Sequence, residues 1–345
     1  MRVEGRKRKI LEAIILDYIA TGEPVGSRTI ARRYNLGVSP ATIRNEMADL
    51  EELGLIEQPH TSAGRIPSDL GYRYYIDCIM ERYELSSAEK EYIRQRFEQK
   101  MGEIEQVLAD ATGLIAELTS YAAVALGPYQ GRAHIQQVQL LYVSPGKALL
   151  VVVTSNGLVE HHLFSVPRGV IRAELNYLSR LLNERLQGIV LEDIKPSLLN
   201  SIYQELLATE HKQLCSLVIE LLEELGNLKR EARIFLDGTL NLFEQPEFRN
   251  IERVKGLLCI LEKSDALREL FAEGPPAGLR IKIGRENKNE EINNCSILTV
   301  TYEINGEVIG NVGVLGPTRM NYSRTISVLE YVARELSQAL EKLCG

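Results

Sequence analysis

The chain has 345 residues and a formal net charge of −7, and charged residues make up 25% and hydrophobic residues 45% of it. This length exceeds what a single hydrophobic core supports, so we expect two or three domains, and the balanced composition excludes a disordered chain. The longest apolar run, residues 148–153, is far shorter than the roughly 20 residues that a membrane-spanning helix needs. The composition therefore indicates folded domains and no membrane partner.

The first residues, MRVEGRKRKI, lead directly into amphipathic sequence and lack the apolar core of a signal peptide. The cysteines are five, an odd number, and no two are spaced as C-x-x-C. We therefore expect a cytoplasmic protein whose cysteines are reduced.

Charge is distributed unevenly along the chain. The first 75 residues hold eleven Lys and Arg against ten Asp and Glu, which leaves 29 against 37 for the rest. A segment of net charge +1 thus precedes one of −8, and the run from Arg6 to Lys9 is a local basic cluster. Nucleic-acid binding requires a local patch and not a global excess, so the charge permits DNA binding without indicating it.

The first two predicted elements are helices. Apolar residues at helical spacing predict an amphipathic helix over about 7–20, which Gly22 ends. A second, short helix is expected to begin with Ser27 as its N-cap and to end near Tyr34.

The third helix has the clearest end signals. Ser39 is a good N-cap, Pro40 suits the first turn because its missing N–H costs nothing there, and Gly54 closes the helix. Residues 55–58 have strand character, and residues 59–65 read as a tight polar loop. Three short helices followed by such a loop are typical of a winged helix-turn-helix.

The outward face of the third helix carries side chains that suit a DNA major groove. Ile43, Met47 and Leu50 form the buried stripe, which turns the opposite side outward. On that side Arg44 can bond guanine and Asn45 can bond adenine, each through two hydrogen bonds. The residues that we expect to contact DNA are Ser39, Thr42, Arg44, Asn45, Ala48, His60, Thr61, Ser62 and Arg65. The alternative is that Arg44 and Asn45 only solvate an exposed face, but the three-helix spacing and the loop favour DNA binding.

A second helical region lies between residues 87 and 125. Apolar residues from Ile93 to Leu118 repeat in steps of mostly three and four, which predicts one long helix or two. This seam packs either on its own domain or against a second subunit, and the sequence leaves both open.

The remainder alternates strands and helices. Expected in chain order are a three-stranded meander over 135–166, a mainly helical stretch over 171–271 with a short strand near Ile234, a hairpin of strands 297–302 and 308–315 around Asn305-Gly306, and a helix over 322–343. This order predicts an α+β fold with a mixed or antiparallel sheet.

Enzyme motifs are missing from the sequence. The segment 310–316 is rich in glycine but does not match G-x-G-x-x-G and lies inside a predicted strand, so we interpret it as tight packing. His161 and His162 are adjacent and point to opposite faces of a strand, which disfavours a shared metal. We expect no catalytic site, no cofactor and no metal.

Five segments together closely resemble one family. TGEPVGS at 21–27, SPATIRNEMADL at 39–50, QPHTSAGRIP at 58–67, GYRYY at 71–75 and GPTRMNY at 316–322 are similar to the HrcA family of heat-inducible transcription repressors. The resemblance implies a dimeric repressor of chaperone operons that binds the inverted-repeat CIRCE operator. It also implies that the GroEL chaperonin promotes the active form of the repressor.

The resemblance implies a domain arrangement as well. We expect a winged helix-turn-helix over residues 1–80 and a GAF-like α+β domain over 86–345, interrupted by a dimerisation subdomain within about 130–275. The main alternative is a ligand-gated regulator with a small-molecule pocket in the GAF-like domain, to which polar loops around Asn156 or Arg319 would contribute. An enzyme with an attached DNA-binding module is disfavoured by the missing motifs.

Overall fold

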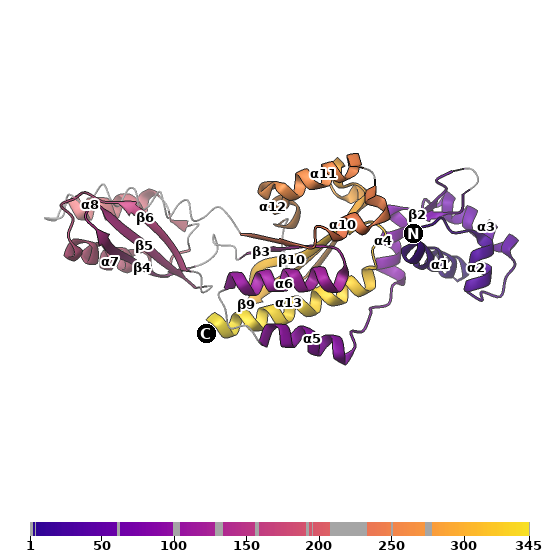
Figure 1. Ribbon diagram of the computed structural model, residues 1–345, viewed down its shortest axis with the longest axis horizontal. Coiled ribbons are helices and arrows are strands. Elements are labelled where there is room, and N and C mark those ends of the chain that lie inside the picture. Colours follow the sequence, from indigo (N-terminus) through magenta and orange to yellow (C-terminus); the bar gives the residue numbers. More distant parts are fainter. Residues whose placement is uncertain are drawn as a thin grey trace.

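The computed structural model describes residues 3, 5–60, 63–98, 104–127, 134–155, 159–190, 193–194, 196–207, 233–249, 251–272 and 278–344. Three parts follow one another along the molecule in Figure 1: the N-terminal helices, a central sheet between helices, and a smaller sheet with its own helices at the opposite end. The order of elements confirms an α+β fold with several cores.

The N-terminal part has the predicted order of elements. It comprises α1 (Arg6–Thr21), α2 (Ser27–Arg33), α3 (Pro40–Glu52) and an antiparallel pair of short strands, β1 (Ile56–Glu57) and β2 (Ile66–Pro67). The start of α3 is confirmed, because the Ser39 side chain accepts a hydrogen bond from the Thr42 amide. The predicted N-cap of α2 is wrong by one residue. The helix begins at a buried Ser27, and the carbonyl of the preceding Gly26 accepts its first hydrogen bonds.

A polar helix start also marks the exit from this part. The Ser68 side chain caps α4 (Asp69–Tyr74), which continues into a π-helical turn, η1 (Tyr75–Ile79). Residues 80–86 then run without helix or strand towards the central part.

The central sheet has five strands in the order β7-β3-β10-β9-β8, and every neighbouring pair is antiparallel. The strands are β3 (Ala122–Leu126), β7 (Ile234–Asp237), β8 (Leu279–Ile283), β9 (Cys295–Ile304) and β10 (Glu307–Pro317). The predicted hairpin turn is confirmed, with φ values of 54° at Asn305 and 80° at Gly306. The short strand near Ile234 is confirmed as well.

Two strands of this sheet were not predicted. The helical prediction over 87–125 is wrong at its end, because Ala122–Leu126 forms β3. Both faces of β3 are covered and all five of its residues are buried, so its sequence shows no alternation of polar and apolar residues. The edge strand β8 is the second strand that the sequence did not predict.

Helices cover both faces of the central sheet (Figure 1). One face carries α5 (Ser87–Glu98), α6 (Ile104–Thr119) and α13 (Tyr322–Cys344), and the other carries α10 (Asn241–Glu244), η5 (Pro246–Arg249), α11 (Ile251–Glu262) and α12 (Ser264–Ala272). Two short turns, η6 (Gly284–Glu286) and η7 (Glu290–Ile292), connect β8 to β9. The apolar seam packs within the chain, since α5 and α6 contact α13 and Ile93, Leu108 and Ile115 are fully buried.

The smaller sheet is the predicted meander. Its strands β4 (Ile135–Ser144), β5 (Lys147–Thr154) and β6 (Val159–Ser165) are antiparallel in the order β4-β5-β6. The helices α7 (Arg172–Leu186) and α8 (Pro196–Leu207) pack on one face and share a separate hydrophobic core with the sheet. The predicted turn at Asn156 lies outside the described residues.

The glycine-rich segment 310–316 lies within β10, where its glycines permit close packing. A Cβ atom at Gly313 would lie 2.3 Å from the carbonyl oxygen of Leu298, and one at Gly310 would lie 2.4 Å from the hydroxyl of Tyr302. These approaches confirm the packing interpretation and leave no phosphate-binding turn in this segment.

We expect Gly313→Ala to lower the free energy of unfolding of the full chain by about 1–3 kcal/mol, because the new methyl group overfills a packed sheet. Denaturant unfolding measures the change. The matched control is Gly169→Ala, where a Cβ would meet no atom within 4 Å. Equal stability of the two variants would contradict the packing role of Gly313.

Candidate nucleic-acid interface

The outward face of α3 is polar and exposed. Arg44, Asn45 and Ala48 are exposed, whereas Ile43, Met47 and Leu50 are buried under them, as the sequence predicts. In Figure 1, α3 lies at the end of the molecule, away from the central sheet. The central and smaller sheets therefore do not cover this face.

The start of α3 carries two hydroxyl groups. The Ser39 Oγ accepts the Thr42 amide at 3.2 Å and lies 3.0 Å from the Thr42 Oγ1. Ser39 is exposed and Thr42 half-buried, so both hydroxyls are near the surface. Hydroxyls and amides at a helix start can bind phosphate oxygens, which fits these residues to a DNA backbone.

The wing, residues 58–65 between β1 and β2, is anchored to the body of the domain at its base. The Arg65 guanidinium binds the Glu51 carboxylate on α3 through Nε at 3.0 Å and Nη2 at 2.7 Å. Its backbone pairs with Val25, and a Cβ at Gly64 would lie 2.5 Å from the Val25 carbonyl. Arg65 thus holds the wing against α3, and a contact between Arg65 and DNA remains a prediction.

The wing also contains three further residues that the sequence predicts to contact DNA. His60 is exposed, and Thr61 and Ser62 lie outside the described residues. The structure therefore brings His60 and Arg65 onto the same loop beside α3.

A groove beside α3 includes one residue that sequence reasoning missed. Arg28, in the first turn of α2, is exposed and lines this groove together with Arg44 of α3 and Gln58 of the wing. The basic sequence of α2, SRTIARR, could have indicated Arg28 as a candidate for DNA contact. Its nearness to Arg44, however, arises from the packing of α2 against α3 and could not be read from spacing along the chain.

The basic cluster at the N-terminus is partly neutralised within the domain. Arg6 lies 3.6 Å from Glu46, and Lys7 lies 2.8 Å from Asp49, both on α3. The hydrogen bond to Asp49 is the main cause of the raised pKa of Lys7. The acidic side of α3 therefore faces α1, and the side with Arg44 and Asn45 faces solvent.

The described residues show neither a metal-binding cluster nor a membrane-spanning helix. Among the described residues, no group of three or more His, Cys, Asp and Glu side chains could hold a metal ion. In that same part of the chain, no helix is both long and apolar enough to cross a bilayer.

Three helices, an outward-facing third helix and an anchored wing define a winged-helix DNA-binding transcription regulator. Comparison with known families agrees with this class. The family model of the HrcA winged helix-turn-helix transcription repressor DNA-binding domain matches residues 4–75, and the model of the HrcA protein C-terminal domain matches residues 105–326. The chain belongs to the HrcA family of heat-inducible transcription repressors.

Individual relatives match over the full length. The heat-inducible transcription repressor HrcA of Moorella thermoacetica is 58% identical over 99% of each chain, and that of Pelotomaculum thermopropionicum is 47% identical over 99% of this chain and 98% of its own. A crystal structure at 2.2 Å of a protein described as hypothetical has a TM-score of 0.63 and 26% identity, over 99% of this chain and 100% of the other. The protein is thus a heat-shock transcriptional repressor with a DNA-binding winged helix.

Proposed function

We propose that this repressor binds the inverted-repeat CIRCE operator of chaperone operons as a homodimer. The exposed face of α3, with Arg44 and Asn45 beside an anchored wing, is the observation that carries the proposal. In this proposal Arg44, Asn45 and Ala48 face the bases in the major groove. The remaining contacts, to the backbone or the minor groove, come from Ser39, Thr42, His60, Thr61, Ser62 and Arg65.

The proposed domains are residues 1–80, which read DNA, and residues 86–345, a GAF-like domain with an inserted dimerisation subdomain. We assign the insertion to the meander and the helices α7 and α8, because they have a hydrophobic core of their own. The chain leaves the central sheet after β3 and returns at β7, and these two strands are neighbours in the sheet. An insertion at this point leaves the central sheet continuous.

An apolar sheet face supports dimerisation through this subdomain. Helix α7 covers one face of the meander, whereas Leu141 and Leu163 on the other face are 41% and 59% exposed. Both lie opposite Leu149 of β5 in the strand register, and Val159 and Val143 add further exposed apolar side chains. Contiguous exposed apolar surface is typical of a protein interface, and the same face on two copies is self-complementary.

A gel-shift titration tests the proposal. We expect the full chain to bind an inverted repeat much more tightly than a single half-site, because two linked contacts raise the effective concentration. Binding should also weaken steeply as salt rises, since phosphate neutralisation releases counterions. Equal affinity for the repeat and the half-site would refute binding as a dimer.

The proposal includes activation by the GroEL chaperonin. A monomer that has not yet dimerised leaves the apolar face of the meander open, and chaperonins bind such surface on folding intermediates. We expect refolding with chaperonin and ATP to raise the fraction of protein that binds operator, measured by gel shift at fixed salt. Equal operator occupancy with and without chaperonin, at concentrations where the unaided chain aggregates, would count against this role.

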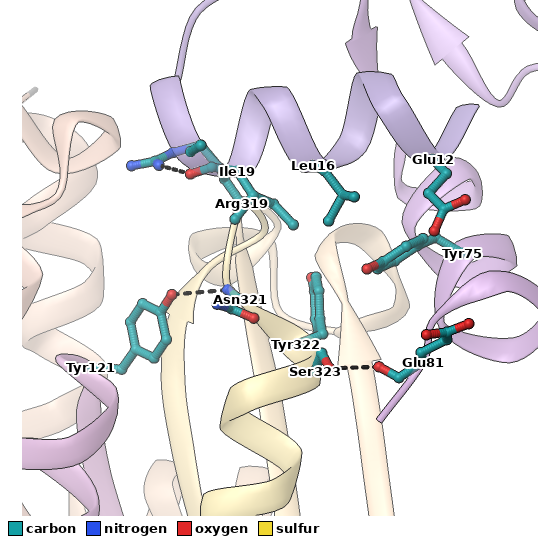
Figure 2. Close-up of a pocket in the computed structure, with 11 residues that line it drawn as sticks. Glu12, Leu16, Ile19, Tyr75, Glu81, Tyr121, Arg319, Asn321, Tyr322 and Ser323 are labelled. Carbon is teal, nitrogen blue, oxygen red and sulfur yellow. Dashed lines mark hydrogen bonds between the residues drawn. The ribbon is translucent and has the colours of Figure 1, made fainter. Parts of the chain in front are cut away.

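One observation favours the alternative, a ligand-gated regulator. A cavity of about 600 Å³ lies between α1 and the start of α13, at the boundary of the proposed GAF-like domain and not inside it as the sequence analysis expected, and Arg319 is among its lining residues (Figure 2). A thermal-shift screen of nucleotides and metabolites tests it, because a ligand that binds only the native state raises its stability. A screen in which no compound shifts the melting temperature favours the chaperonin-coupled repressor.

A further inference from the structure

Two motifs that are far apart in the sequence meet where the winged-helix domain joins the central domain. Tyr72, from GYRYY, and Tyr322, from GPTRMNY, are fully buried, with ring centroids 5.7 Å apart. The Tyr322 hydroxyl lies 2.6 Å from the Ser296 Oγ and donates to the Thr318 carbonyl at 2.7 Å. The contact between the two domains is therefore a packed interface and not only a covalent linker.

Arg319 binds both domains at once. Its Nη1 donates to the backbone carbonyl of Ile19 in α1 at 2.7 Å, and its Nε donates to the Glu247 carboxylate of η5 at 2.5 Å. Figure 2 shows Arg319 beside the last turn of α1, with the bond to Ile19 dashed. The Ile19 carbonyl is one of the last four of its helix, which have no partner inside the helix, so Arg319 satisfies it from another domain.

The surroundings of Arg319 favour an arginine that bonds Ile19 and Glu247 at the same time. The Arg319 side chain is only 12% exposed, and Glu247 supplies the opposite charge that a buried guanidinium requires. Gly22 ends α1 with φ of 71° and lies against the guanidinium, since a Cβ there would be 3.6 Å from its Nε. A planar fork with several N–H groups can reach both partners together, which the single ammonium of lysine cannot do equally.

A second set of contacts holds α4. Arg73 binds the Glu286 carboxylate, with Nε at 2.9 Å, and donates to the Ile281 carbonyl at 2.8 Å. These bonds anchor α4, which leads towards the connecting residues 80–86. Arg319 instead anchors α1, against which α3 packs. Two anchors on different helices restrict rotation of the winged-helix domain more than one anchor does.

We propose that Arg319 is a positioning residue for operator binding, which fixes the orientation of the winged-helix domain through the Ile19 carbonyl. In the dimer, fixed orientation gives the two recognition helices one separation and hence one preferred spacing of half-sites. This inference rests on the proposed function, because it requires a dimer on an inverted repeat. Losing the contact leaves each recognition helix intact and lowers the probability that both engage together.

The experiment uses the full-length chain and a series of DNA duplexes. Affinity is measured for one half-site, for the inverted repeat, and for repeats whose spacer is longer by half a helical turn or by one turn. The variants are Arg319→Gln and Arg319→Lys. The matched control is Arg324→Gln in the first turn of α13, shortly after Arg319 in the chain, because Arg324 pairs with Glu89 and contacts Tyr83, neither of which belongs to the winged helix.

We expect the unaltered protein to discriminate strongly between spacers. Arg319→Gln should keep half-site affinity within about twofold, lose about tenfold or more on the preferred repeat, and flatten the dependence on spacer length. The affinity of Arg319→Lys for the preferred repeat should lie between those of Arg319→Gln and the unaltered protein, because lysine keeps the pair with Glu247. The affinities of Arg324→Gln should match those of the unaltered protein.

Each other outcome has a defined meaning. If the unaltered protein binds the repeat no better than the half-site, the proposed function fails and the inference fails with it. If it prefers the repeat but Arg319→Gln keeps the same spacer preference, the inference alone is wrong. Equal losses on the half-site and the repeat also overturn it, because they indicate damage to α1. If circular dichroism shows that Arg319→Gln does not fold, Arg319→Lys and Glu247→Gln decide by the same criteria.

Discussion

Replacing Leu163 by Glu is expected to convert the repressor to a monomer and to weaken binding to the inverted repeat by about 10²–10⁴-fold, the range over which linkage of two sites raises affinity. Leu163 lies on the apolar outer face of the meander and is 59% exposed, so the substitution leaves the core beneath it intact. In a dimer that buries this face, the carboxylate introduced in each copy would lose its water without gaining a partner of opposite charge, which destabilises the dimer.

Sedimentation gives the oligomeric state of this variant, and gel shifts on the repeat and on one half-site give the two affinities. Half-site binding should be unchanged, because β6, the strand that carries Leu163, lies at the opposite end of the molecule from α3 (Figure 1). Leu240→Glu is the matched control: Leu240 is 75% exposed and lies outside the meander. A Leu163→Glu protein that remains a dimer would show that this sheet face is not the interface.

Alanine at Arg44 or Asn45 should weaken operator binding by about 1–3 kcal/mol each, which is the discrimination that one bidentate contact to a base provides. Both side chains are exposed on α3, so their removal should not change the stability of the domain. The loss should fall on particular operator positions, where the variant no longer distinguishes the correct base from others.

Competition gel shifts with operators altered one base pair at a time measure this loss of discrimination. Arg28→Ala is the comparison, since Arg28 lines the same groove from α2 and we expect it to bind phosphate. This variant should bind all DNA sequences more weakly by a similar factor. The slope of log affinity against log salt concentration should fall by about one, because one fewer phosphate is neutralised. A uniform small loss for Arg44→Ala and Asn45→Ala on every sequence would refute base reading by α3.

Much of the winged helix was predictable because its signals are local. Ser39 with Pro40 starts α3 and Gly54 follows its end, and the hydrogen bonds that define these ends join residues a few positions apart. The meander and the Asn305-Gly306 hairpin were predicted for the same reason, since turn conformation depends on the turn residues themselves. The exposed face of α3 followed from helical periodicity alone.

The local signals failed where burial depends on distant segments. Ala122–Leu126 is a strand because β10 and β7 flank it, and its sequence without alternation fits a helix equally well. The role of Arg65 also depended on the fold, because Glu51 lies beside it only after the wing has packed on α3.

The sequence by itself determined where most of the helices and turns and the exposed face of α3 lie, because periodicity, caps and turn residues act within a few positions of the chain. Tertiary structure alone decided which of these elements touch. It brought Arg28 beside Arg44, turned Arg6 and Lys7 towards the acids of α3, and joined Arg319 to Ile19 across 300 positions of the chain. The residues that neighbour a side chain in the sequence do not indicate a partner that far away, since the contact exists only when both domains have folded and packed together.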